Sequence, residues 1–460
     1  MVGHHTGACA SRTIGLGVKR RSFAGSAIAA AAAIGLARAR SSSAAPASTR
    51  IAGPLGSAGP AIARDYFGMH FHRLLPDVGA RRPTEWPTGQ VGALRLWDST
   101  TRWADIAPRR DRWDFDRLDA HVALAEANGA PVLHTLGSTP RWASARPDEP
   151  GPYGPGCAAE PRAMSDWQDY VSRVAMRYRG RIATYEVWNE PYFSELVADR
   201  GQPGFFSGSV AQMVEMTRIA RDAIRAADRD AKLATPGFVN GTHRLDRFLE
   251  AGGAGLVDVV AYHFYARDAD QFSAQIAEVR AVTARRGVAH LPLWNTECGV
   301  ERMPPRDSPR ADAEAADSAA SARLAQFLIL GAAARLGRFY YHAWDNDQTG
   351  MVDRSGTANA RAPAWREAMR WLLDSTVAPA VSLGSGAYRV DAVQRGVRYA
   401  TLWSEQRARV DPRWPTGWHA ESVEKLTGGA TAAAAFDPAT RGLVLGPAPV
   451  RVRLAQVASS

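Results

Sequence analysis

Short apolar runs alternate with helical patterns through most of this chain, and this alternation limits the possible folds more than any other feature of the sequence. The runs are rich in β-branched and aromatic residues, which is typical of strands, and an amphipathic stretch follows each of them. Strand-then-helix units predict a parallel sheet, and eight parallel strands close most naturally into a (β/α)8 barrel. The predicted strands are 66–72, 93–97, 131–136, 183–188, 233–238, 257–265, 291–296 and 339–344.

An open doubly wound sheet is the alternative to such a TIM barrel. No Gly-x-Gly-x-x-Gly motif follows the first strand, so nothing in the sequence indicates the dinucleotide site that is typical of that alternative. The chain is therefore predicted to be an α/β protein with a barrel over residues 62–378.

Several predicted helices carry start signals. Ser165 with Gln168, and Ser209 with Gln212, have the spacing of a capping box, in which the hydroxyl and the amide satisfy backbone groups of the first turn. Pro363 is predicted to open the last helix of the barrel, because proline suits the first helical position.

The pattern changes to strict alternation beyond about residue 380. This is typical of antiparallel strands, and it predicts a small β-sandwich domain over residues 379–460. The sequence shows no cluster of catalytic residue types there. The strands predicted in this part are 388–393, 399–403, 443–445 and 450–454.

The first 47 residues have the pattern of an export signal. Lys19, Arg20 and Arg21 precede an apolar run that is shorter than the roughly 20 residues of a membrane span, and the paired arginines resemble a twin-arginine signal. Six of the basic residues that give the chain its net charge of +10 lie in this segment, which contains no acidic residue. Little of the positive charge is therefore left for the rest of the chain. We therefore expect an exported protein, periplasmic or secreted, with no nucleic-acid partner.

Two cysteines, Cys157 and Cys298, lie outside the predicted signal. Export permits a disulfide between them, and separate thiols are the alternative. No Cys/His spacing in the chain indicates a zinc site.

Two glutamates stand where a barrel places its working residues, at the carboxyl ends of strands. Strand four ends in Trp-Asn-Glu-Pro at 188–191, with Glu190, and strand seven ends in Thr-Glu-Cys-Gly at 296–299, with Glu297. One such glutamate alone would more often form a salt bridge with a loop arginine. Two carboxylates at one pocket mouth suit glycosidic bond cleavage, in which one protonates the leaving oxygen and the other attacks or stabilises the anomeric carbon.

These two motifs, 107 residues apart, resemble those of glycoside hydrolase clan A, the retaining barrel glycosidases. The resemblance implies that Glu190 is the acid/base and Glu297 the nucleophile. It also implies that Asn189 hydrogen-bonds the sugar 2-hydroxyl. Arg95 would keep the nucleophile ionised.

Further positions fit the same template. His263 and Tyr265 resemble the His-x-Tyr of the clan, whose tyrosine supports the nucleophile. Trp344 closes strand eight, where clan members place an indole that stacks on sugar. The long loops 137–164 and 192–208 carry aromatic residues, Trp142 among them, that are predicted to line a cleft for an extended glycan.

Residues 113–119 and 135–143 are similar to glycoside hydrolase family 39 and to related bacterial glycosidases that act on secreted exopolysaccharide. The Cys298-Gly299 pair departs from the aromatic-Asn ending of the family 39 xylosidases and iduronidases, so their substrates are not implied. Family 5 is the alternative.

The sequence thus predicts an exported retaining glycoside hydrolase that acts on a poly- or oligosaccharide and needs no metal or cofactor. Retention predicts a carboxyl separation of about 5 to 5.5 Å, whereas about 6.5 to 9.5 Å would indicate inversion. One alternative is a glycan-binding or polysaccharide-export protein without turnover. Another is a metal-dependent hydrolase, for which the candidate ligands are His70, His72, Asp98 and His134. The sugar, its linkage and anomer, endo or exo action and the oligomeric state stay open.

Overall fold

The computed structural model describes residues 59–76, 83–202, 204–301, 310–428, 430–432 and 442–456. The predicted export signal, residues 1–47, lies outside the described residues. Among the described residues, no helix is both long and apolar enough to pass through a membrane.

Eight parallel strands form the barrel, in the order β5-β4-β3-β2-β1-β8-β7-β6. Parallel bridges from Ala234 to Val259 and from Phe238 to Tyr262 join the two ends of this order. The predicted TIM barrel is therefore confirmed, and each predicted strand overlaps an observed one. The strands are β1 (Phe67–His70), β2 (Ala93–Leu96), β3 (Val132–Leu136), β4 (Ile182–Val187), β5 (Lys232–Ala234), β6 (Val260–His263), β7 (Leu293–Cys298) and β8 (Phe339–Tyr341).

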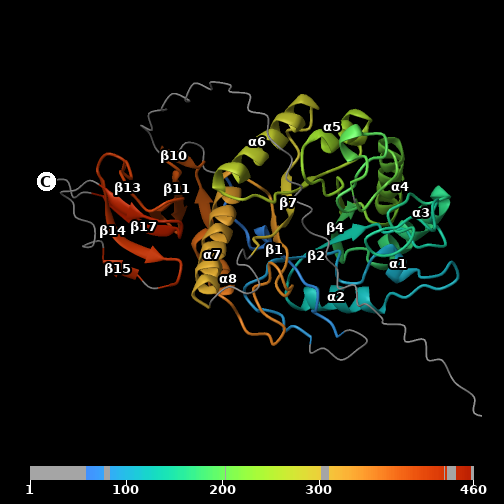
Figure 1. Cartoon of the computed structure of the whole chain (residues 1–460), viewed down its shortest axis with the longest axis horizontal. Coiled ribbons are helices and arrows are strands. Elements are labelled where there is room, and N and C mark those ends of the chain that lie inside the picture. The colour runs from blue at the N-terminus through green and yellow to red at the C-terminus, as the bar shows by residue number, and fades with distance from the viewer. Residues whose placement is uncertain are drawn as a thin grey trace, which may run out of the picture. The chain divides into compact units, whose positions relative to one another are not determined.

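Helices surround the strands, and the neighbours α7 and α8 run side by side (Figure 1). The described α-helices are α1 (Trp103–Ile106), α2 (Asp116–Ala127), α3 (Met164–Arg177), α4 (Val210–Ala227), α5 (His243–Glu250), α6 (Ala269–Arg285), α7 (Arg310–Ala333) and α8 (Arg361–Leu372). Short 3-10 turns are η1 (Arg64–Tyr66), η2 (Val197–Asp199) and η3 (Gly253–Gly255).

One of the two predicted capping boxes is present. The Ser209 hydroxyl accepts from the Gln212 backbone N–H at 3.1 Å, and the Gln212 side chain accepts from the Ser209 N–H at 2.7 Å. The prediction for Ser165 is wrong, because α3 starts one residue before it and its N-cap is Ala163, which makes no side-chain cap bond. Pro363 lies in the first turn of α8, two residues after its start. The N–H groups of a first turn have no acceptor within the helix, so a proline there costs no helical hydrogen bond.

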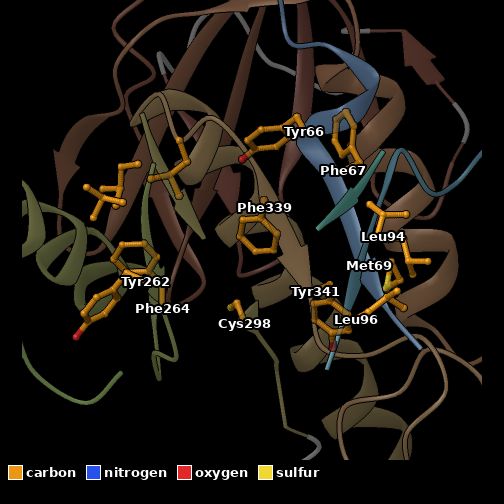
Figure 2. Packing of buried hydrophobic residues seen from close by; sticks show 14 of the residues in the cluster. Tyr66, Phe67, Met69, Leu94, Leu96, Tyr262, Phe264, Cys298, Phe339 and Tyr341 are labelled. Atoms are coloured by element: carbon orange, nitrogen blue, oxygen red, sulfur yellow. The ribbon is translucent and has the colours of Figure 1, made fainter. Parts of the chain in front are cut away.

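The main core lies between the strands and the helices. Figure 2 shows Tyr66, Phe67, Phe339 and Tyr341 among the residues of this layer, and all of them are buried. A second, smaller cluster lies inside the barrel, from alternate positions of its strands; its members are Ala93, Leu133, Ala234, Val259, Ala261, Trp294 and Tyr340.

The C-terminal part is antiparallel, as predicted. A seven-stranded sheet has the order β10-β11-β12-β17-β14-β15 with β9 paired to β11, and β13 pairs with β16 separately. The strands are β9 (Ser375–Val377), β10 (Val381–Gly384), β11 (Ala387–Gln394), β12 (Val397–Ser404), β13 (Ala408–Val410), β14 (Trp418–Lys425), β15 (Ala430–Ala432), β16 (Leu443–Leu445) and β17 (Val450–Gln456). Four of these, β11, β12, β16 and β17, match the predicted strands.

The C-terminal strands share a core with the barrel. Tyr388, Val390 and Trp403 belong to the same hydrophobic cluster as the barrel strands. The side-chain amide of Gln326 on α7 also donates to the Pro447 carbonyl at 2.8 Å. The described residues of the barrel and of the C-terminal strands accordingly belong to one compact unit.

Cys157 and Cys298, whose pairing the sequence left open, are separate, buried thiols. Cys298 ends β7 and is fully buried, and burial raises the pKa of its thiol above the usual range. Cys157 lies in the loop before α3.

Candidate active site

Strand alternation directs a set of charged side chains into the barrel. On β2, Leu94 and Leu96 belong to the outer core, so Arg95 between them faces inward. The same alternation applies to His263 on β6, between Tyr262 and Phe264 of the outer core. Glu186 on β4, between two outer-core residues, also faces inward.

Arg95 is the centre of the site. Its Nη1 donates to Glu297 Oε2 at 2.9 Å, and its Nε donates to Glu186 Oε2 at 2.8 Å. Its Nη2 donates to Asn189 Oδ1 at 2.8 Å. Arg95 is 1% exposed, so these charge-assisted bonds are screened little by water. One guanidinium therefore fixes residues from β2, β4 and β7 relative to one another.

Glu297 is held at both oxygens. Arg95 donates to Oε2, and the Tyr265 hydroxyl donates to Oε1 at 2.8 Å. Burial, together with the charge of Glu297, raises the pKa of Tyr265 well above its ordinary value, so the phenol stays protonated and remains a donor. Glu297 is thereby oriented as an acceptor at the barrel mouth.

Glu190 differs in its surroundings. Burial raises the pKa of Glu190 to about 7, against the opposing attraction of Arg95. Its Oε1 lies 2.9 Å from His263 Nδ1. Burial also lowers the pKa of His263 to about 4, so this ring is neutral at pH 7.

The tautomer of His263 follows from its second contact. His263 Nε2 lies 3.4 Å from Arg95 Nη2, and a guanidinium only donates, so Nε2 is the acceptor. The ring proton of the neutral imidazole is then on Nδ1, which donates to Glu190. The atoms of Glu190, His263 and Glu297 that face one another all lie within 4.8 Å, so the two predicted carboxylates are brought together.

The backbone that presents Glu190 is strained. Trp188 has a φ of +73° and Glu190 a φ of +43°, which lie in the left-handed region that residues other than glycine rarely adopt. Hydrogen bonds hold this conformation: the Glu190 N–H donates to the Gly237 carbonyl at 2.9 Å, and the Trp188 indole donates to the Phe205 carbonyl at 2.7 Å. Gly237 itself has no space for a side chain, because a Cβ there would lie 2.4 Å from His263 Nε2.

Three polar residues lie beside the two glutamates of the site, Glu190 and Glu297; they are His72, Asp98 and His342. They follow β1, β2 and β8, which are neighbours in the barrel. The Tyr153 hydroxyl donates to Asp98 Oδ1 at 2.5 Å. Although burial opposes it, hydrogen bonds from His342 and Tyr153 hold the pKa of Asp98 well below its usual range.

Two predicted sugar-binding residues, Trp344 and Trp142, have other contacts in the structure. Trp344 is 5% exposed and belongs to the main hydrophobic core, where the centroid of its ring lies 6.4 Å from that of Phe71. The chain leaves strand geometry after Tyr341, and His342 takes the place at the strand tip that the sequence assigned to Trp344.

Trp142 anchors its loop to the segment around α1. Its indole donates to the Ala107 carbonyl at 2.8 Å, and its ring packs edge-on against Trp103 of α1. The structure therefore brings Arg95, Asn189, Glu190, His263, Tyr265 and Glu297 together. The sugar-binding role of Trp142 and Trp344 stays a prediction.

Sequence analysis missed two residues of the site, Glu186 and His342. Glu186 had a signal, since a carboxylate inside an apolar strand needs a buried partner. His342 also had one, because it directly follows strand eight. Among the candidate metal ligands, His72 and Asp98 are neighbours, whereas His134 is buried with no hydrogen-bond partner at either ring nitrogen, and burial lowers its pKa to about 3.

Comparison with known proteins gives matches over the barrel. A model described as glycosyl hydrolase family 10 matches residues 95–239, and one described as glycosyl hydrolase catalytic core matches residues 216–356. Together they span the strands that carry both glutamates.

Solved structures have a similar fold at low sequence identity. A family 39 glycoside hydrolase from the gut symbiont Bacteroides cellulosilyticus WH2 has a TM-score of 0.59 at 15% identity, covering 79% of this chain and 76% of that one. A glucosidase from Croceicoccus marinus has a TM-score of 0.57 at 15% identity, covering 87% and 98%. A monomeric β-xylosidase from Caulobacter crescentus CB15 has the same TM-score, identity and coverage as the glucosidase.

Proposed function

We propose that the chain is a glycoside hydrolase that cleaves O-glycosidic bonds with retention, using Glu190 as acid/base and Glu297 as nucleophile. The two glycosyl hydrolase models that match parts of the barrel, and the similar fold of a family 39 enzyme, support this proposal. The observation that carries this proposal is the contrast between the two facing carboxyl groups. Glu190 has a pKa raised to about 7 by burial, whereas Glu297 accepts hydrogen bonds from Arg95 and Tyr265. One group is suited to hold a proton and the other to carry a charge.

The reaction then proceeds in two displacements. In the first, a Glu297 oxygen attacks the anomeric carbon while Glu190 gives its proton to the leaving glycosidic oxygen. In the second, Glu190 takes a proton from water, the water oxygen attacks the anomeric carbon, and the bond to Glu297 breaks. The protein ends with Glu190 protonated and Glu297 ionised, as it began.

The spacing of the carboxylates supports retention. One oxygen of Glu190 lies within 4.8 Å of one oxygen of Glu297, a close approach that favours the short carboxyl separation of retaining enzymes, about 5 to 5.5 Å, over the 6.5 to 9.5 Å of inverting ones. Asn189 supports a sugar contact in the same place: Arg95 occupies its Oδ1, so its side-chain N–H₂ is left to donate to a 2-hydroxyl.

The proposed substrate is a poly- or oligosaccharide, encountered outside the cytoplasm after export by the signal in residues 1–47. The resemblance to family 39 and to bacterial exopolysaccharide glycosidases supports this class. Because two of the similar structures are described as a glucosidase and a β-xylosidase, aryl glucosides and xylosides belong in the first substrate panel. Replacement of both Arg20 and Arg21 by lysine should leave the protein in the cytoplasm on cell fractionation.

The decisive experiment combines stereochemistry with a matched pair of variants. Wild-type protein is screened on activated aryl glycosides and bacterial exopolysaccharides, and the anomer first formed is identified by NMR. We expect retention, complete loss of turnover in Glu297→Gln, and unchanged turnover in Glu278→Gln, which alters an exposed glutamate on α6. Inversion, or hydrolysis by a pure Glu297→Gln preparation, would refute the assignment. Glycan binding without any hydrolysis would favour the non-catalytic alternative.

A further inference from the structure

Hydrogen bonds join the segments that follow five neighbouring strands of the barrel, β8, β1, β2, β3 and β4. The carboxylate of Asp345, after β8, accepts from the backbone N–H groups of His72 and Arg73, after β1, at 2.7 and 3.0 Å. The Ser207 N–H, after β4, donates to the Ala158 carbonyl, after β3, at 2.8 Å. These five segments, called here the rim, are thus tied together in two pairs.

Asp98, which follows β2, connects the two pairs. Its Oδ1 accepts from the hydroxyl of Tyr153, in the loop after β3, at 2.5 Å. Its Oδ2 lies 3.2 Å from Nε2 of His342, after β8, and a carboxylate only accepts, so this ring nitrogen donates to it. The rim is therefore linked without a break from the loop after β4 to the segment after β8.

Aromatic rings fill the part of the rim above β2. Tyr153 and Phe205, from the loops after β3 and β4, have ring centroids 5.5 Å apart. Both pack on Trp97 at the end of β2, with centroids 5.7 and 6.2 Å from its ring. Arg146 Nη2 also donates to Ser207 Oγ at 2.9 Å, a second bond between the same two loops. The two long loops thus close against each other on this side of the barrel mouth.

The rim lies on the side of the site away from the leaving group. Glu190, which protonates the leaving oxygen in the proposed reaction, has contacts toward β5 and β6: its N–H donates to the Gly237 carbonyl, and its Oε1 lies 2.9 Å from His263 Nδ1. β1 and β2 are opposite these two strands in the barrel. The sugar that Glu297 attacks is therefore held toward β8, β1 and β2, where a ring nitrogen of His342 lies within 4.8 Å of a Glu297 oxygen.

Asp98 has acceptor sites left for that sugar. Its side chain is 24% exposed. Although burial opposes it, hydrogen bonds from His342 and Tyr153 hold the pKa of Asp98 well below its usual range, so the carboxylate is ionised. A carboxylate has about four lone-pair sites, and these two donors take one each. The remaining sites suit sugar hydroxyls. In the interior of a glycan, one hydroxyl of each sugar is replaced by the bond to the preceding sugar.

We propose that the enzyme is exo-acting: it removes one sugar at a time from the non-reducing end of a glycan, and Asp98 binds free hydroxyls of that terminal sugar. The rim supports this mode because it closes the side toward which a longer glycan would extend from the attacked sugar. The inference rests on the proposed function and goes beyond it, since the sequence left endo and exo action open.

The first test measures where wild-type protein cuts. Xylo- and gluco-oligosaccharides of increasing length, labelled at the reducing end, are digested and the products sized over time. We expect a monosaccharide and labelled fragments that shorten by one unit at a time. An aryl bioside, which carries two sugars on the attacked side, should release its aryl group only after a lag, whereas the aryl monoside releases it at once. Internal fragments early in the digest, or immediate release from the bioside, would overturn the proposal.

A matched pair of aspartate variants tests the role of Asp98. Asp98→Asn keeps the size of the side chain and removes its charge, so kcat/KM for the aryl monoside should fall roughly 10- to 100-fold, the worth of a charge-assisted hydrogen bond. Asp148→Asn, which changes an exposed aspartate in the loop after β3, should match wild type. An unchanged kcat/KM in Asp98→Asn, with circular dichroism showing it folded, would contradict the assignment. Wild-type protein that hydrolyses no glycoside at all would refute the proposed function and this inference with it.

Discussion

At the scale of single residues, Arg95 serves three acceptors, and Glu186 is the one that the proposed reaction does not use. Glu186 Oε2 accepts from Arg95 Nε at 2.8 Å and from the Thr135 hydroxyl at 2.8 Å. Glu186 is fully buried. Because its bonds go to Arg95 and Thr135, we infer that it positions the guanidinium, and through it Glu297 and Asn189.

Glu186→Gln tests this positioning role. The amide keeps the size of the side chain but removes the charge, so Arg95 is expected to lose its fixed orientation. A charge-assisted hydrogen bond is worth about 1.5–3 kcal/mol, which corresponds to a roughly 10- to 100-fold fall in kcat. KM should change less than kcat, because ground-state sugar contacts remain. Steady-state kinetics measure the two separately, and an unchanged kcat would contradict the inference.

The acid/base role of Glu190 predicts a pH dependence. Its pKa is raised to about 7, so the group is protonated below that pH and becomes ionised as the pH rises through it. Hydrolysis of substrates with poor leaving groups should therefore decline above about pH 7, because the general acid has lost its proton.

Glu190→Gln should remove this alkaline limb. It should also slow hydrolysis of the same substrates by roughly 10²- to 10⁴-fold, the usual contribution of a general acid. An aryl glycoside whose leaving group needs no proton should be affected least in the first step. A pH–rate profile of the variant that keeps the decline near pH 7 would assign the limb to another group.

At the scale of elements, two helices with the same sequence signal begin differently. Ser209 caps α4, whereas Ser165 is already inside α3 and exposed. A capping box depends on the serine having extended backbone angles, which Ser209 has with φ of −90° and ψ of 162°. The residue spacing in the sequence does not contain that information.

The matched substitutions Ser209→Ala and Ser165→Ala follow from this difference. Ser209→Ala should lower the free energy of unfolding by about 1 kcal/mol, because it leaves a first-turn N–H of α4 without its acceptor. Ser165→Ala should change it little, since alanine suits a helical position. Urea unfolding followed by circular dichroism compares the two, and equal effects would contradict the observed caps.

The barrel strands were predictable because both of their faces are covered, which produces continuous apolar runs. β14 gave no such signal: it reads Trp-His-Ala-Glu-Ser-Val-Glu-Lys, and only Val423 in it is buried. In the site, the paired glutamates were predictable because strand tips converge on one face. The direction of Trp344 was not, because it lies beyond the strand, where alternation no longer decides which side a residue faces.

At the scale of the whole molecule, the barrel and the C-terminal sheet share side chains of one core. Trp403 on β12 is fully buried, and its ring stacks on Tyr388 of β11 with centroids 5.2 Å apart. The Tyr388 hydroxyl bonds to Asp270 on α6, and Arg370 on α8 pairs with Glu424 on β14. These contacts predict that the two parts unfold together.

Trp403→Ala tests this coupling. Removal of a buried indole costs about 3–5 kcal/mol, and we expect one transition at a lower Tm with hydrolytic activity lost in the same temperature range. Val444→Ala, which trims an exposed side chain on β16, is the control and should leave the Tm unchanged. A separate early transition with activity retained beyond it would show that the C-terminal sheet unfolds on its own.

The left-handed backbone at Glu190 has a consequence for attempts to raise the thermal stability of this protein by laboratory evolution. Such a conformation costs about 1–3 kcal/mol in any residue but glycine, and the same position also buries a carboxyl group. Glu190→Gly would remove both the backbone strain and the cost of burying the carboxyl group, and would yield a more stable but inactive protein. A selection for thermostability alone would therefore favour variants that have lost the carboxyl group on which the proposed chemistry depends. Thermostability and catalytic turnover must be screened together.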